Sequence, residues 1–159
     1  MNAMLPSPTL PAFPPIVPFW VDPPPITWVD FRPDPSARER SARILVVDDD
    51  AAIAATVTAI LEDEGYSVLV ARDGAEALGL LEGSAGAVDL ILLDMRMPGM
   101  DGWAFAQAYR QLPRPHAPVV TMTAAHSAQT WASEIASEGV LPKPFELTDL
   151  LSVVERFTA

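Results

Sequence analysis

From residue 43 onward, hydrophobic positions along the chain alternate between two spacings. Short aliphatic or β-branched runs predict five strands, at residues 43–47, 67–71, 88–93, 117–122 and 139–141. Between them, hydrophobic residues recur every three or four positions, as in amphipathic helices. The clearest stripes are Ile53, Val57, Ile60 and Leu61 after the first strand, and Leu147, Leu150, Leu151 and Val154 after the fifth. The pattern therefore predicts five strand–helix units.

Nearly every position of the predicted strands is apolar, which indicates strands buried on both faces. Such strands belong to parallel sheets, whose crossover helices cover both sides of the sheet. We expect an α/β fold with a doubly wound, five-stranded parallel sheet of the flavodoxin-like (βα)5 kind. Two helix starts are also predicted: Asp50 as an N-cap, rather than a metal ligand, and Asp73 with Glu76 as a capping box.

Prolines divide the chain into two parts. Of the 17 prolines, 11 lie before residue 42. This density excludes helix and central strand, so residues 1–41 are expected to form a Pro-rich, extended or disordered segment with P-x-x-P spacings. Residues 42–159 are expected to form one folded domain.

The amino-acid composition limits the classes of molecule that the chain is expected to bind. The net charge of −11 and the pI of about 4.4 oppose binding to nucleic acid or to an anionic membrane surface. The chain contains no cysteine, which excludes disulfides and thiolate chemistry. No secretion signal or apolar span of membrane length is present, so the cytoplasm is the expected compartment.

Polar residues gather where the predicted strands end. Asp48 and Asp49 end the first strand, Asp94 the third, Thr123 the fourth and Lys143 the fifth. The carboxyl ends of parallel strands share one edge, where ligands bind. Three clustered carboxylates repel one another, and a hard divalent cation such as Mg²⁺ would offset that repulsion.

Lys143 is the only lysine in the chain. Its compact ammonium suits an anion that comes and goes, and the Thr123 hydroxyl can donate a hydrogen bond to the same anion. With these groups around it, Asp94 is placed for phosphoryl transfer to a carboxylate.

Four ordered motifs, ILVVDDD, DLILLDMRMPGMDG, VVTMTA and LPKPF, resemble the receiver domain of two-component response regulators over residues 43–157. The resemblance implies that Asp94 is phosphorylated from a sensor histidine kinase or a histidine phosphotransfer protein. It implies Mg²⁺ ligation by Asp49, Asp94 and the backbone carbonyl of Arg96, with Asp48 acting largely through water. Thr123 resembles the switch hydroxyl and Lys143 the phosphate-pairing lysine, preceding a cis bond to Pro144.

The expected function is that of a single-domain response regulator, similar to chemotaxis regulators. It would be a phosphoprotein that assists its own phosphorylation and dephosphorylation rather than an enzyme. It would signal by docking to an unidentified downstream protein or by phosphorelay. Two alternatives remain: a receiver-like scaffold that works without phosphorylation, and a Mg²⁺-dependent aspartyl-phosphate phosphohydrolase. Arg96 disfavours the latter, which generally has an aspartate two residues after its nucleophile.

One residue departs from the family pattern. Val140 stands where the family usually has Tyr or Phe, whose inward swing accompanies phosphorylation. Trp131, in the fourth predicted helix, is a candidate substitute. His116 and His126 have no partners at ligand spacing and are expected to be solvated surface residues.

Overall fold

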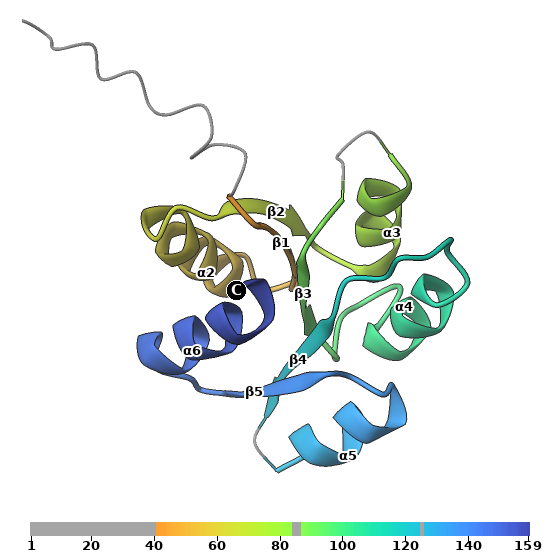
Figure 1. Ribbon diagram of the computed structural model, residues 1–159. Coiled ribbons are helices and arrows are strands. Elements are labelled where there is room, and N and C mark those ends of the chain that lie inside the picture. Colours follow the sequence, from red (N-terminus) through yellow and green to blue (C-terminus); the bar gives the residue numbers. More distant parts are fainter. Residues whose placement is uncertain (1–40, 84–86, 125) are drawn as a thin grey trace, which may run out of the picture. The chain divides into compact units, whose positions relative to one another are not determined.

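The computed structural model describes residues 41–83, 87–124 and 126–159 (Figure 1). The predicted Pro-rich segment, residues 1–41, lies outside the described residues except for Ser41, so the boundary stays a prediction. The elements in chain order are β1 Arg43–Val47, α2 Ala51–Asp63, β2 Ser67–Ala71, α3 Gly74–Glu82, β3 Leu90–Asp94, α4 Gly102–Tyr109, β4 Val119–Ala124, α5 Ala128–Glu134, β5 Gly139–Lys143 and α6 Leu147–Thr158.

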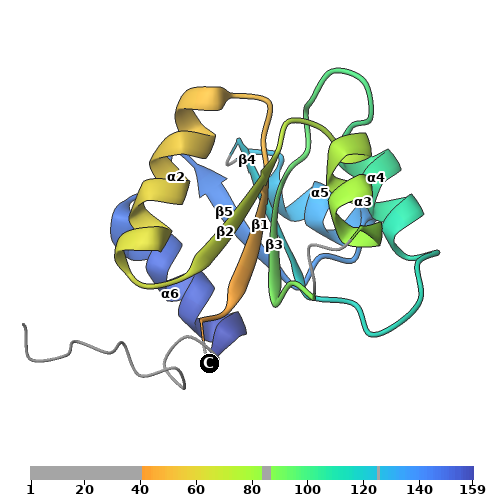
Figure 2. The ribbon, with the colours of Figure 1, turned by 90° about the horizontal axis from the view of Figure 1, so that it is seen from above.

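The five strands form one parallel sheet in the order β2-β1-β3-β4-β5. Helices α2 and α6 cover one face, and α3, α4 and α5 cover the other (Figure 2). This arrangement is the predicted doubly wound, flavodoxin-like α/β fold. Because all strands run the same way, their carboxyl ends lie along one edge of the sheet.

The sheet separates two hydrophobic cores. Alternate residues of each central strand point to opposite faces, so Leu45 and Leu93 pack with α3 and α4, while Val46 and Leu92 pack with α2 and α6. All five residues of β3 are buried, including Asp94 at its end. This full burial explains the unbroken apolar run that the sequence shows there.

The boundaries of three strands differ from prediction: β3 is Leu90–Asp94 instead of residues 88–93, and the changes in β4 and β5 lie at proline residues. β1 and β2 occupy the predicted residues, whereas β4 starts at Val119 instead of residue 117. Pro118 has no backbone N–H to donate to the neighbouring strand. Its carbonyl still accepts from the Ile91 N–H, but the regular hydrogen bonding of β4 begins only at the next residue. β5 runs on through Pro142 to Lys143, which an edge strand tolerates because one side of its backbone is unpaired.

The N-cap predicted at Asp50 is confirmed, because its carboxylate accepts from the backbone N–H of Ala52 and Ile53 at 2.9 and 3.2 Å. The Asp73 prediction is half right. Asp73 caps α3 through the Glu76 N–H, but Glu76 reaches back to Arg72 rather than to Asp73.

In α6, Leu150 and Val154 are buried as expected, while Leu147 is 51 % exposed. Leu147 is the first residue of the helix, so the apolar stripe starts one turn later than its spacing suggests.

Candidate functional site

The carboxyl edge of the sheet brings together the three predicted aspartates. Carboxylate oxygens of Asp48, Asp49 and Asp94 all lie within 4.8 Å of one another. Asp48 and Asp94 are buried, 1 % and 8 % exposed, because Asp94 ends the central strand β3 and Asp48 follows β1 beside it. Asp49 is exposed. The cluster thus has a buried side and an open side.

Lys143 lies within reach of two of these carboxylates. Its Nζ donates to Asp48 Oδ2 at 2.7 Å and lies 3.5 Å from Asp94 Oδ1. The second Asp48 oxygen accepts from the Asp50 N–H at 2.9 Å. Asp48 is therefore held on both oxygens, and Lys143 is shared between Asp48 and Asp94. The Lys143–Pro144 peptide bond is cis, as the resemblance implied.

Burial raises the pKa of Asp94 to about 6 from its ordinary 3.8. The Lys143 ammonium works against this rise, and the neighbouring Asp48 and Asp49 carboxylates add to it. The surrounding protein thus makes the ionised form of the Asp94 carboxyl group less favourable than it is in water. Positive charge beside it opposes this effect.

Thr123 lies at the same edge. Its side chain belongs to the end of β4 and is 3 % exposed, and its Cα pairs with Pro142, the residue before Lys143. Arg96 follows β3 in an exposed position. The structure thus brings the predicted residues Asp48, Asp49, Asp94, Thr123 and Lys143 to one edge of the sheet, with Arg96 two residues beyond β3.

Gly102 contributes to the site although its role is not evident in the sequence. Its N–H donates to the Met95 carbonyl at 3.1 Å, and α4 begins there. A Cβ at this position would lie 2.8 Å from Met95 Cα and 2.9 Å from the Asp94 carbonyl oxygen. Only glycine lets α4 start this close to the Asp94 backbone. The signal in the sequence is the glycine that closes MPGMDG.

An apolar groove of about 550 Å³ opens beside Lys143. Ala52, Ile53 and Val57 of α2 line one part of it, and Pro144 and Phe145 line another. Among the described residues that line the groove, Lys143 alone is charged. The groove therefore presents apolar surface beside Lys143.

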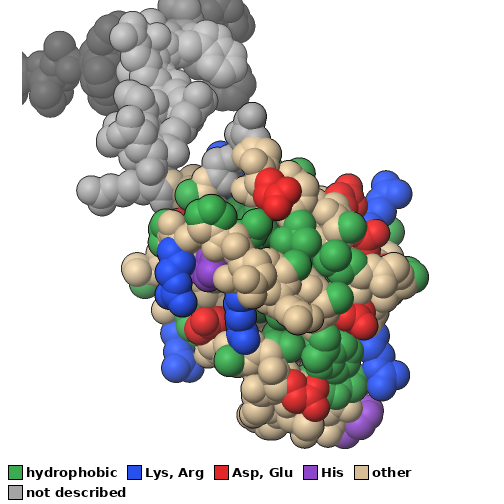
Figure 3. All heavy atoms as spheres, turned by 90° about the vertical axis from the view of Figure 1, so that its right-hand side faces the viewer, with side chains coloured by type: hydrophobic (Ala, Val, Ile, Leu, Met, Phe, Trp, Pro, Cys, Tyr) green, Lys and Arg blue, Asp and Glu red, His purple; other side chains and the backbone are tan. Residues whose placement is uncertain are grey.

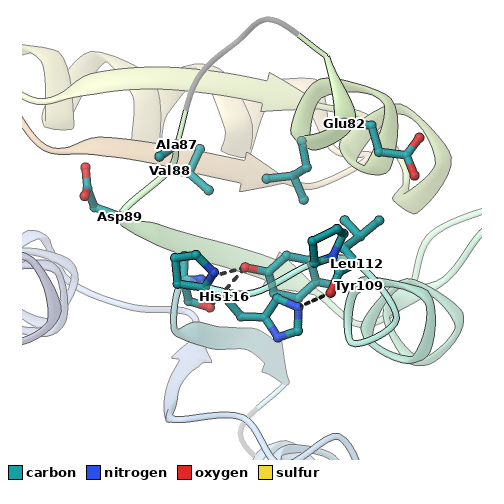
Figure 4. A pocket seen from close by; sticks show the side chains of 11 residues that line it. Glu82, Ala87, Val88, Asp89, Tyr109, Leu112 and His116 are labelled. Atoms are coloured by element: carbon teal, nitrogen blue, oxygen red, sulfur yellow. Dashed lines mark hydrogen bonds between the residues drawn. The ribbon is translucent and has the colours of Figure 1, made fainter.

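A larger pocket, of about 680 Å³, is lined by the residues that precede β3, the C-terminal ends of α3 and α4, and the loop before β4 (Figure 4). His116 borders it, and this histidine corrects the sequence prediction. It is half-buried, its Nε2 lies 2.8 Å from the Leu112 carbonyl oxygen, and its ring lies 4.8 Å from that of Tyr109. His116 is thus a structural residue rather than a solvated one, whereas His126 is exposed as predicted.

Comparisons with known proteins agree with this fold. Residues 44–155 match the family described as the response regulator receiver domain. The fold and the site define a receiver domain of a two-component response regulator, and this chain belongs to that family.

The chain is 38 % identical over 112 residues to the transcriptional regulatory protein CpxR of Escherichia coli K12, an alignment that covers 69 % of this chain and 46 % of CpxR. It is 36 % identical over 114 residues to the response regulator MprA of Mycobacterium bovis BCG Pasteur, covering 70 % of this chain and 48 % of MprA. The chain thus spans about half the length of these curated relatives.

Among solved structures, the chemotaxis response regulator CheY4 of Vibrio cholerae superposes with a TM-score of 0.66 and 32 % identity, covering 73 % of this chain and 98 % of CheY4. A response regulator from Chloroflexus aurantiacus superposes with a TM-score of 0.67 and 31 % identity, covering 74 % of this chain and 97 % of that one. Both superpositions cover nearly all of the solved chain.

Within the part of the chain that the structure describes, no helix has both the length and the apolar character needed to cross a membrane.

Proposed function

We propose that this receiver domain is a Mg²⁺-dependent phosphoacceptor that takes a phosphoryl group from a phosphohistidine onto Asp94. The observation that carries the proposal is the shared lysine: Lys143 Nζ lies 2.7 Å from Asp48 and 3.5 Å from Asp94, inside a cluster of three carboxylates. A cation that is already shared between two anions can move to a third with a small displacement. The arriving phosphoryl group is that anion.

The donor set fits Mg²⁺, a hard cation that prefers one or two carboxylates, oxygen donors and water. Asp49, Asp94 and the backbone carbonyl of Arg96 would hold the ion, with Asp48 acting largely through water. When bound, Mg²⁺ supplies positive charge that offsets the carboxylates and the oxygens of the transferred group.

In the transfer, a carboxylate oxygen of Asp94 attacks phosphorus and forms the new O–P bond. The N–P bond of the donor breaks, and the imidazole nitrogen leaves with the bonding electron pair and takes up a proton. Lys143 pairs with a phosphoryl oxygen, and the Thr123 hydroxyl donates to another. Asp48 keeps Lys143 at the site before the phosphoryl group arrives.

The apolar groove between α2 and Phe145 supports docking of the donor, a sensor histidine kinase or a histidine phosphotransfer protein, beside the acceptor. The output is a docking or phosphorelay partner of unspecified identity.

The expectation that the chain does not bind nucleic acid rests on its net charge of −11 and stays a prediction, since the name of one relative describes a transcriptional regulatory protein. On the face drawn in Figure 3, basic side chains lie mainly toward the rim, with acidic ones among them.

The scaffold alternative depends on Val140, which lacks the ring that usually accompanies phosphorylation in the family. It predicts that partner affinity is the same with and without a beryllofluoride mimic of the phosphoryl group. The phosphohydrolase alternative is disfavoured by Arg96, which is exposed and carries no carboxylate.

Phosphoimidazole tests the proposal, because it contains the N–P bond of a phosphohistidine. The chain should gain one phosphoryl group by intact mass when Mg²⁺ is present and lose that gain when the metal is chelated. Asp94→Asn should gain no phosphoryl group. Asp63→Asn, a change at an exposed residue at the end of α2, is the matched control and should be labelled like the unmodified chain. Labelling that persists unchanged in chelator would contradict the metal dependence.

A further inference from the structure

The Arg96 side chain bridges the loop after β3 and helix α5. Its guanidinium carbon lies 4.9 Å from the centroid of the Trp131 ring. Arg96 is exposed and Trp131 is half-buried, so solvent reaches the contact. The contact joins the segment that carries Asp94 to a helix more than 30 residues later in the chain.

Two further residues hold Trp131 in place. The Trp103 ring of α4 meets it edge-on, with centroids 5.1 Å apart and planes at 71°. Trp103 Nε1 donates to Glu134 Oε2 at 2.7 Å, and Glu134 lies three residues after Trp131 in α5. We call Arg96, Trp103, Trp131 and Glu134 the tryptophan cluster. It connects the β3–α4 loop, α4 and α5.

Arg96 has two possible partners within reach. It follows Asp94 by two residues, so their Cα atoms lie within about 7 Å, and an arginine side chain spans such a distance. A phosphoryl group would place about two negative charges on Asp94. Paired hydrogen bonds from a guanidinium to phosphate oxygens are stronger than a solvent-exposed contact with an indole ring.

We propose that Arg96 reports the state of Asp94 to α5 by changing partners. Without phosphate the guanidinium stacks on Trp131, and with phosphate on Asp94 it leaves the ring and pairs with phosphoryl oxygens. The loss of this contact frees Trp131, and through it Trp103 and Glu134, to rearrange on the surface of α4 and α5. The inference rests on the proposed phosphorylation of Asp94.

In this mechanism the aromatic residue that responds to phosphorylation is Trp131 of α5, rather than a residue of β5. Val140 of β5 is half-buried, its Cα pairs with that of Thr121, and its small side chain has no ring to swing. Trp131 is tied by a direct contact to the second residue after the acceptor. The tryptophan cluster can thus transmit a signal without an aromatic residue at position 140.

The indole N–H signals in a ¹⁵N–¹H NMR spectrum test the inference, each assigned by replacing one tryptophan with phenylalanine. The probe is beryllofluoride with Mg²⁺, and ¹⁹F NMR measures how much of it is bound. In the unmodified chain the probe should shift the Trp131 and Trp103 signals, and Arg96→Gln should reduce both shifts at least threefold at equal probe occupancy. Arg156→Gln is the matched control, because Arg156 also lies over an aromatic ring, that of Phe157 in α6.

Unchanged shifts in Arg96→Gln at equal occupancy would overturn the inference alone. If Arg96→Gln binds too little probe for the comparison, Trp131→Leu provides the second test. It should abolish the shift of the Trp103 signal, and a Trp103 shift of full size would overturn the inference. Failure of the unmodified chain to bind the probe, or equal binding by Asp94→Asn, would instead overturn the proposed function on which the inference rests.

Discussion

Lys143 donates a 2.7 Å hydrogen bond to Asp48, a side chain that is only 1 % exposed, across a separation of 95 residues. This pair joins the ends of β1 and β5 and explains how a buried carboxylate is tolerated directly after β1, next to the central strand of the sheet. It also keeps the only lysine of the chain within 3.5 Å of Asp94.

Removing Lys143 should leave Asp48 buried without its counterion. We expect Lys143→Met to lower the free energy of unfolding by roughly 1.5 to 3 kcal/mol in chelator, the usual value of a hydrogen bond to a charged group. Adding Asp48→Asn should recover most of the loss, because a neutral amide is less costly to bury. Urea unfolding of the two single variants and the double variant measures this coupling, and additive effects would show that the pair is not coupled.

Asp94 should make stability depend on pH in the metal-free chain. Its pKa is raised to about 6 from 3.8, so between these values the folded state holds more protons than the unfolded state. The contribution of this group to stability is therefore full below about 4 and is lost as pH rises through about 6.

It follows that Asp94→Asn should stabilise the chain in chelator at neutral pH by up to about 3 kcal/mol, and the gain should vanish in acid. Thermal melts from acid to neutral pH, with Asp63→Asn as control, measure the difference. A gain that does not change with pH would contradict the assignment to Asp94.

Mg²⁺ should raise the melting temperature, because a ligand that binds only the folded state stabilises it by about 2.7 kcal/mol at 100 times its dissociation constant. Asp49→Ala should lose most of this gain. Asp50→Ala should keep it, because the Asp50 carboxylate is occupied with the N–H groups of α2. Melts of both variants with and without Mg²⁺ decide, and equal losses would mean that the carboxylates are misassigned.

Gly102→Ala should destabilise the chain by roughly 1 to 3 kcal/mol, the usual cost of overpacking, and should impair phosphorylation, because the new methyl group meets the backbone at Asp94 and Met95. Gly79→Ala is the matched control. Gly79 lies in α3, and a methyl group added there would have open space within 4 Å, so alanine should stabilise the helix by about 0.5 to 1 kcal/mol. Equal effects of the two changes would exclude a steric role for Gly102.

The strand pattern predicts the fold well because buried parallel strands leave a strong local signal: β1 and β2 begin and end at the predicted residues. Most of the site follows from the same signal, since Asp48, Asp49, Asp94, Thr123 and Lys143 lie at or next to the ends of strands. Contacts between distant side chains leave no such trace. Nothing in the spacing of Arg96 and Trp131 indicates that they meet, and the role of His116 depends on a backbone carbonyl that a loop presents to it.

The central claim is that Asp94 accepts the phosphoryl group, and the most direct measurement is the mass of the chain after incubation with a small acyl phosphate and Mg²⁺, followed by mapping of the labelled peptide. The account predicts one added phosphoryl group, located on Asp94, present in Asp63→Asn and absent from Asp94→Asn. Undiminished labelling of Asp94→Asn, or a label mapped to another residue in the unmodified chain, would contradict it.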